Sequence, residues 1–424
     1  MPRLLSIIAI FFSTSANAQL TLPTYALKDV TIIDANYRQP LAHQTVVIRG
    51  KIIEQIFSDN AQQLPDSMTV FNLPGKYLIP GLIDTHVHMA TDPSGTDARE
   101  PTLKVLKNML YSGITSVRDM AGDARVLSGY ARDAEVGDII SPNIYYSALM
   151  AGPEFFNDPR SVATARGGTA GEMSYMKGVS DTTDLVLAIA QAKGTGATGI
   201  KLYADLSGPL VKKIVNEARK QGMKVWGHAW LSPAKPSDMI NGGVQSISHA
   251  PLLIREKLDS VPSSWKKAGY LEKNWKDSMA FDASLFVLMK AHNTILDATM
   301  ATYKKWAKEE PSRAYNYTIT KHITSAAYKA GVKICAGTDN DQEAFVQQEI
   351  KLLVSDAGFS PIDALIAGTK HGAEAIGIDR DHGTVEVHKI ADLLLLDGNP
   401  LENIDHLDDV YMVIKDGTIF KHNL

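Results

Sequence analysis

The tripeptide His86-Val87-His88 constrains this chain more than any other sequence feature. It ends the run Pro80-Gly81-Leu82-Ile83-Asp84-Thr85, whose apolar residues are typical of a buried strand. In an extended segment, residues two positions apart project to the same side, so both imidazoles can bind one metal ion. Histidine pairs also occur by chance on half-buried strands, so the weight of this motif depends on the rest of the chain.

Four further candidate metal ligands stand where short apolar runs end: Lys201, His228, His249 and Asp339. Helix-like segments separate these runs, among them 208–222, with apolar residues at helical spacing, and 343–357. Alternation of strands and helices predicts an α/β fold with a parallel sheet.

Three more strand-like runs, at 114–118, 139–147 and 293–299, bring the number of expected strands to eight. Eight such repeats close a parallel sheet into a (β/α)8 TIM barrel, whose active site lies at the carboxyl ends of the strands. The candidate ligands follow strands one, four, five, six and eight, so we expect them to converge on one mouth.

Both ends of the chain predict a second, smaller domain. Short strands at 30–34, 45–48 and 51–53 precede the barrel, and strands at 392–396 and 410–414 follow it. We therefore expect a discontinuous β-sandwich formed by residues 19–76 and 380–424, with the barrel over 77–379.

Two stretches exceed what a minimal barrel needs. Residues 152–180 follow strand three, and residues 255–282 follow strand six. Long loops at this end of a barrel usually shape the substrate pocket, although either stretch could also be a surface excursion.

The N-terminus has the pattern of a signal peptide. Arg3 precedes the apolar run 4–12, and Ala16-Asn17-Ala18 follows as a cleavage site. The run is too short to span a bilayer as a helix. We expect residues 1–18 to be removed, leaving Gln19 first and the protein periplasmic or secreted with no membrane anchor, while an uncleaved anchor is the alternative.

Composition limits the partners. The chain has 424 residues, of which 45% are hydrophobic and 21% charged, with a net charge of −4, so nothing suggests a nucleic-acid partner. The expected partner is a small-molecule substrate, and a homo-oligomer is possible. Cys335 is the only cysteine, so no intrachain disulfide can form.

The ligand motifs together resemble the amidohydrolase superfamily. The resemblance is carried by PGLIDTHVHM, the lysine of IKLY, the histidines of GHAW and SISHA, and the aspartate of AGTD. It covers nearly the whole mature chain and extends to the tail at 383–401. The most similar branch is the binuclear one with a carboxylated bridging lysine, and within it the imidazolonepropionase-related hydrolases and the prolidase-like dipeptidases.

The resemblance implies a metal centre and a hydrolytic mechanism. It assigns His86, His88 and Asp339 to one ion, His228 and His249 to the other, and a carbamate of Lys201, formed with carbon dioxide, to the bridge between them. Imidazole and carboxylate ligands favour zinc, although manganese, cobalt and iron accept similar sets. A water between two cations loses its proton readily, and the resulting hydroxide would attack a carbonyl group while Asp339 transfers the proton to the leaving amine. Tyr203 is expected either to donate to the oxyanion or only to pack.

Several alternatives stay open at this stage. Taken singly, His228 could be a core histidine, Lys201 a surface residue and Asp339 a turn residue. Leu231 occupies the position where mononuclear deaminases of the superfamily have Glu, which disfavours deamination. Ser248 stands where prolidase-like dipeptidases often have an acidic residue. An amidohydrolase acting on a small molecule is the leading hypothesis, beside a dipeptidase, a lactonase, a phosphotriesterase and a catalytically silent binding protein.

Overall fold

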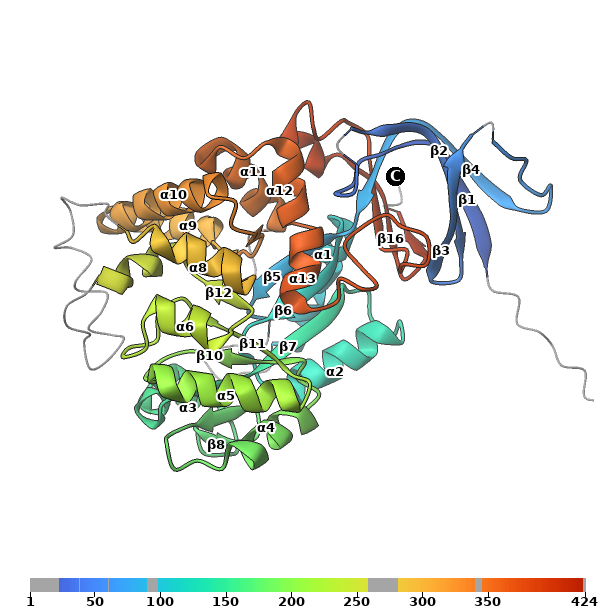
Figure 1. The fold of residues 1–424 in the computed structure, drawn as a ribbon. Coiled ribbons are helices and arrows are strands. Elements are labelled where there is room, and N and C mark those ends of the chain that lie inside the picture. The colour runs from blue at the N-terminus through green and yellow to red at the C-terminus, as the bar shows by residue number, and fades with distance from the viewer. Residues whose placement is uncertain are drawn as a thin grey trace, which may run out of the picture.

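The computed structural model describes residues 23–37, 39–59, 61–89, 98–257, 281–339 and 345–421. The expected signal peptide and most of the 255–282 stretch lie outside these residues. The described chain forms a barrel of strands and helices beside a separate curved sheet (Figure 1).

Eight parallel strands form the barrel, as the sequence predicts. In spatial order they are β5 (Leu82–Val87), β6 (Ile114–Asp119), β7 (Asn143–Ala151), β10 (Gly199–Leu202), β11 (Lys224–His228), β12 (Ser246–Ser248), β13 (Ile295–Asp297) and β14 (Ile334–Cys335). Backbone hydrogen bonds close the barrel between its first and last strands: the Thr85 N–H donates to the Ala336 carbonyl at 3.0 Å, and the Asp339 N–H donates to the His86 carbonyl at 2.8 Å.

One strand begins later than expected. The predicted run 139–147 is β7, which starts at Asn143. Pro142 has no N–H to give to a ladder, and the Ile139 N–H already donates to the carbonyl of Asp133 at the end of the preceding helix. The ladder therefore starts after the proline.

Helices surround the barrel (Figure 1). They are α1 (Arg99–Tyr111), α2 (Ala124–Glu135), α4 (Leu185–Gly194), α5 (Gly208–Lys220), α6 (Pro236–Gly242), α8 (Ser284–His292), α9 (Met300–Glu309), α10 (Ala314–Lys329), α11 (Val346–Ala357), α12 (Pro361–Ala367) and α13 (Lys370–Ile376), with short 3-10 turns at Ala250–Lys257, Pro311–Arg313 and Ile404–Asp408. Helix α5 shows why these segments are helical: Ser207 caps its N-terminus by accepting from the Leu210 N–H, and its buried residues recur at helical spacing.

The 152–180 excursion has structure of its own. It contains a 3-10 turn at Pro153–Asn157, helix α3 (Pro159–Thr164) and the short strands β8 (Glu172–Met173) and β9 (Met176–Gly178). Strand β9 pairs in parallel with β7, so the excursion is anchored to the barrel.

The smaller domain is one continuous sheet of seven strands from both ends of the chain. Its strands, in spatial order, are β17 (Thr418–Phe420), β16 (Val410–Lys415), β15 (Leu393–Leu396), β4 (Thr69–Pro80), β1 (Thr24–Ile32), β2 (Leu41–Arg49) and β3 (Ile52–Ser58). The sheet curves over a shared core, since the Tyr25 hydroxyl donates to the Gly417 carbonyl at 2.9 Å and Ile52 bridges to Ile390. The sequence did not reveal β4 or β17.

Strand β15 joins the two cores. Its four leucines are fully buried, and successive side chains of a strand point to opposite faces. Leu393 and Leu395 belong to the core of the small sheet, whereas Leu394 and Leu396 belong to the barrel core. Within the described part of the chain, no helix is long and apolar enough to cross a membrane.

The contact between the barrel and the small sheet can be tested at Gly113. This residue has a positive φ of +98°, and a Cβ there would lie 2.5 Å from the Leu394 side chain. Gly137 also has a positive φ, +79°, but a Cβ there would meet nothing within 4 Å. We expect Gly137→Ala to lose roughly 1–2 kcal/mol of unfolding free energy from backbone strain alone. Gly113→Ala should lose about 1–3 kcal/mol more, because it also overpacks the interface. Urea denaturation of both variants measures the difference, and equal losses would contradict this account of the interface.

Candidate metal centre

Two adjacent barrel strands bring His86, His88 and Asp339 together. The Oδ1 atom of Asp339 lies 3.2 Å from His86 Nε2 and 3.0 Å from His88 Nε2. One possible ligand atom from each residue lies within 4.8 Å of the others, the arrangement of a site that could hold a metal ion. The site stands where the first and last barrel strands meet, at the carboxyl ends of β5 and β14.

A buried carboxylate fixes the loop that carries Asp339. Asp84 accepts from the Thr338 hydroxyl at 2.7 Å, the Thr338 N–H at 3.1 Å and the His86 N–H at 3.0 Å. Gly337 permits the close approach, because a Cβ there would lie 2.8 Å from the His86 Cβ and overlap the carboxylate of Asp297. The sequence Gly337-Thr338-Asp339 is therefore a geometric requirement of the site and not only a turn.

The remaining predicted ligands lie on the other side of this cluster. The ring centroid of His249 is 4.5 Å from that of His228 and 5.3 Å from that of His86. His249 Nδ1 is 3.9 Å from Asp339 Oδ2. Lys201 is fully buried at the end of β10, with its Nζ donating to Ser248 Oγ at 3.5 Å. All six residues predicted as ligands thus face one mouth.

Asp297 is a functional candidate that the sequence reasoning missed. It ends β13, is fully buried, and its Oδ2 lies 2.7 Å from His86 Nδ1 and accepts from Ser248 Oγ at 2.9 Å. It therefore connects the histidine of β5 with the hydroxyl that faces Lys201. Its position at the end of the run Ile295-Leu296-Asp297 is the same signal that identified the other candidates.

Burial controls the charge state of the centre. It lowers the pKa of Lys201 to about 7, although the negative charge of Asp297 acts to raise that pKa. It also lowers the pKa of His249 to about 3. Burial also acts to raise the pKa of Asp339, but the charge of His86 and hydrogen bonds from His86 and His88 outweigh it and hold that pKa well below its usual range. Imidazole nitrogens and a carboxylate are ligands that divalent ions of the zinc type bind.

A cavity of about 350 Å³ opens beside His88 and Asp339. The 152–180 excursion contributes part of its wall, and helix α9 contributes another part; the lining residues from these two segments are Phe155, Arg160, Ser161, Thr164 and Met176, and Thr302, Lys305 and Trp306. The lining of the cavity thus combines two candidate ligands, His88 and Asp339, with aromatic and basic side chains.

Tyr203 lies in the wall of this cavity. Its ring centroid is 4.1 Å from that of His228 and 4.6 Å from that of Phe155. Burial raises its pKa to about 12, with the charge of Arg160 acting in the opposite direction, so the phenol keeps its proton at neutral pH. It is in place both to pack and to donate a hydrogen bond into the cavity.

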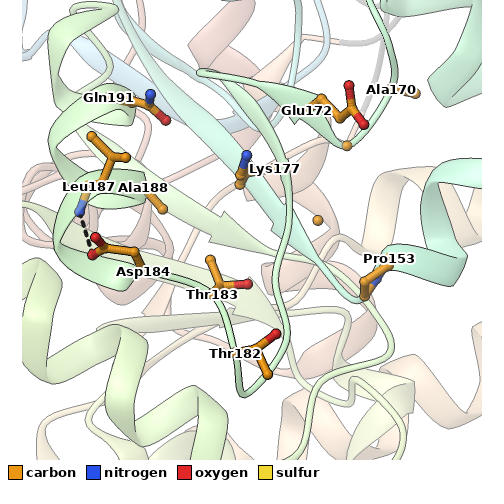
Figure 2. Close-up of a pocket in the computed structure, with 12 residues that line it drawn as sticks. Pro153, Ala170, Glu172, Lys177, Thr182, Thr183, Asp184, Leu187, Ala188 and Gln191 are labelled. Carbon is orange, nitrogen blue, oxygen red and sulfur yellow. Dashed lines mark hydrogen bonds between the residues drawn. The ribbon is translucent and has the colours of Figure 1, made fainter.

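A second, larger hollow lies away from these residues. Figure 2 shows its lining, which includes Pro153, Glu172, Lys177 and the start of α4 from Asp184. Its volume is about 530 Å³, yet it contains none of the six candidate ligands. The volume of a cavity therefore does not identify the active site in this chain. The smaller cavity is the better candidate, because His88 and Asp339 line it.

Comparison with known proteins gives the same assignment. Residues 77–420 match the model of the amidohydrolase family. The chain is 25% identical to ochratoxinase from Aspergillus niger over an alignment 437 positions long, gaps included. The alignment covers 90% of this chain and 84% of the fungal enzyme. It is 26% identical to enamidase from Eubacterium barkeri over 127 residues, which are 28% of this chain and 31% of that enzyme.

Solved structures share the fold. A Xaa-Pro dipeptidase with bound methionine superimposes with a TM-score of 0.76 at 22% identity, covering 94% of this chain and 100% of that one. The crystal structure of A. niger ochratoxinase gives a TM-score of 0.75 at 22% identity, covering 95% and 96%.

The chain belongs to the amidohydrolase family. It is a hydrolase that acts on carbon–nitrogen bonds. The resemblance inferred from its five strand-end motifs is confirmed.

The role of Asp297 can be tested directly. Asp297→Asn replaces the carboxylate beside His86 Nδ1 with a neutral amide, so the ring loses its charged partner. We expect the affinity for Zn²⁺ to fall roughly 10- to 100-fold, the usual effect of removing a carboxylate that orients a ligand histidine. Competition with a chromogenic chelator measures this. Asp363→Asn is the control, because Asp363 accepts from Tyr328 and Ser360 on outer helices, and an equal loss in both variants would refute a local role.

Proposed function

We propose that the protein is a metal-dependent amidohydrolase that cleaves an amide bond in a small molecule bearing a carboxylate. The observation that carries this proposal is the cluster of four histidines, an aspartate and a buried lysine at a barrel mouth that opens into a cavity with basic side chains. The established family membership supplies the reaction class.

The donor set fits two divalent ions, for which zinc is the proposed identity. His86, His88 and Asp339 would hold one ion, His228 and His249 the other, and Lys201 would join them as a carbamate. When bound, such ions lower the pKa of a water and polarise a carbonyl group.

Lys201 meets the requirements of a carbamate. Its amine is fully buried and, among the described residues, its hydrogen-bond partner is the hydroxyl of Ser248 and not a carboxylate. Addition of carbon dioxide to the neutral amine, with release of one proton, would convert a group that repels cations into one that binds them.

Asp339 is the proposed proton carrier. One oxygen faces both histidines of β5, and the carboxylate borders the cavity. An ionised carboxylate in this place can accept the proton of the attacking water and deliver it to the leaving amine. Tyr203, which keeps its proton, would donate to the developing oxyanion.

The cavity wall supports the choice of substrate class. Arg160, which is ion-paired with Asp158, and Lys305 line the same cavity as His88 and Asp339. Phe155 and Trp306 add aromatic surface. Two cations beside an aromatic wall would accept an N-acyl amino acid or a dipeptide, with its carboxylate on the basic side. The name of the Xaa-Pro dipeptidase, which shares the fold, agrees with a dipeptide substrate.

We also propose that the protein is exported. The support is the sequence pattern of residues 1–18, with a cleavage site at Ala16-Asn17-Ala18.

Metal stoichiometry tests the binuclear centre without an activity assay. Protein purified with excess zinc and bicarbonate should contain close to two ions per chain. Lys201→Ala should lose at least one of them, and acetate or propionate, which can fill the vacated space with a carboxylate, should restore binding in part. Elemental analysis gives the answer, with Lys193→Ala on an outer helix as the control. A single ion in the fully loaded wild type would exclude the bridge.

Turnover tests the reaction and the role of Asp339. We expect the enzyme to hydrolyse N-acyl amino acids faster than the corresponding N-acyl amino acid amides, which lack the carboxylate. Asp339→Asn should fold normally but lose roughly two to four orders of magnitude in turnover, as expected for a general acid–base group.

Lactones and phosphotriesters serve as the comparison substrates in the same assay. Preferential hydrolysis of either class would contradict the proposed amidase function. Near-normal turnover by a folded, metal-loaded Asp339→Asn variant would remove Asp339 from the mechanism.

A further inference from the structure

Helix α9 forms one wall of the cavity. Thr302, Lys305 and Trp306 all line it, and their spacing of three and four residues places them on one face of the helix. A shift of α9 along or about its axis would move all three side chains together. The position of this helix therefore sets the shape of the wall.

The helix does not cap its own N-terminus. Thr299 occupies the N-cap position, with a left-handed φ of +54°, but its side chain makes no capping hydrogen bond to α9. Its hydroxyl instead lies 3.0 Å from Nδ1 of His249, one of the proposed ligands. The residue type that normally caps a helix is thus engaged with the metal centre.

Glu349 supplies the missing cap from another helix. It projects from α11, is fully buried, and its two carboxylate oxygens accept from the first backbone N–H groups of α9: Met300 at 2.9 Å and Ala301 at 2.6 Å. These groups have no partner within a helix, and the positive end of the helix dipole favours an anion beside them. Both oxygens are used, so the contact fixes the direction of α9 as well as its end.

A buried carboxylate is a weak source of net stability. Burial acts to raise the pKa of Glu349, and the hydrogen bonds from the two backbone N–H groups act in the opposite direction by favouring the ionised form. An apolar residue among the neighbouring Ile350 and Leu353 would avoid the desolvation cost. Glu349 therefore contributes mainly to the position of α9. An apolar side chain could not accept hydrogen bonds from the backbone N–H groups of Met300 and Ala301.

We propose that Glu349 is a positioning residue for substrate binding: it caps α9 in place of Thr299 and thereby holds the Thr302, Lys305 and Trp306 wall against the cavity. The inference rests on the proposed function in one respect, that this cavity receives the substrate. It assigns Glu349 no contact with the reacting atoms.

The test compares Glu349→Gln and Glu349→Leu with Asp34→Asn. Asp34 is a matched control, since it is a buried carboxylate that also accepts from two backbone N–H groups, those of Asn36 and Val385, but it lies in the small sheet. Glutamine offers a single acceptor oxygen and leucine offers none, so the two variants at Glu349 form a graded series. If Glu349→Leu does not fold, the comparison of Glu349→Gln with Asp34→Asn still tests the proposal.

We expect the KM for an N-acyl amino acid to rise roughly tenfold in Glu349→Gln and further in Glu349→Leu, because misplacing a substrate-binding element costs up to about a hundredfold in efficiency. The zinc content should be unchanged and kcat should stay within about threefold of the wild type. Asp34→Asn should lower thermal stability while leaving KM unchanged. Equal stability losses at both positions with no change in KM would overturn the proposal.

Hydrogen exchange separates a failure of this inference from a failure of the proposed function. If the wild type hydrolysed no substrate, the proposed function would be wrong, yet the capping of α9 would still be measurable. Faster amide exchange at residues 300–303 in Glu349→Gln, but not in Asp34→Asn, supports the capping role. Unchanged exchange there would overturn it.

Discussion

The seam between β5 and β14 is the constraint on which the rest of the structure depends. The same two backbone hydrogen bonds that close the barrel, from Thr85 and from Asp339, also set the aspartate against His86 and His88. Hydrogen bonds that Thr338 donates to the Asp84 carboxylate hold the loop, and Gly337 allows the close approach. Closure of the barrel and the geometry of the site therefore depend on the same hydrogen bonds. A substitution that separates β5 from β14 would also disrupt the candidate metal centre.

Around the seam, buried charged side chains are held by hydrogen bonds and ring contacts. Arg118 lies inside the barrel, where it donates to the carbonyls of Thr85 and Ala375 and stacks over Trp226 at 4.6 Å. Asp297 links His86 to Ser248 on the side of the mouth. Since a buried charge is costly unless it is paired or binds a metal, these contacts limit how the strand ends can be rearranged. A metal centre needs ligands whose positions are fixed by contacts of this kind.

Sequence reasoning succeeded where a signal is local and repeated. The barrel and all six residues at its mouth follow from polar residues at the ends of apolar runs, a pattern tied to strand geometry. It failed where the controlling contact is distant in the chain. Strand β4 has no clean alternation, because it pairs with β1 and β15 and is only partly buried. Glu349 looks like any polar residue of an amphipathic helix, and only the fold shows that it meets the start of α9, 48 residues earlier along the chain.

The candidate metal ligands and the cavity wall come from different parts of the barrel. The candidate ligands all stand at strand ends, whereas the cavity wall comes from the 152–180 excursion and from α9. A fold does not by itself determine the substrate, because function depends on the site that a fold carries. In this chain the cavity wall is held by contacts that lie outside the strand ends, the β9–β7 pairing and the hydrogen bonds from the start of α9 to Glu349.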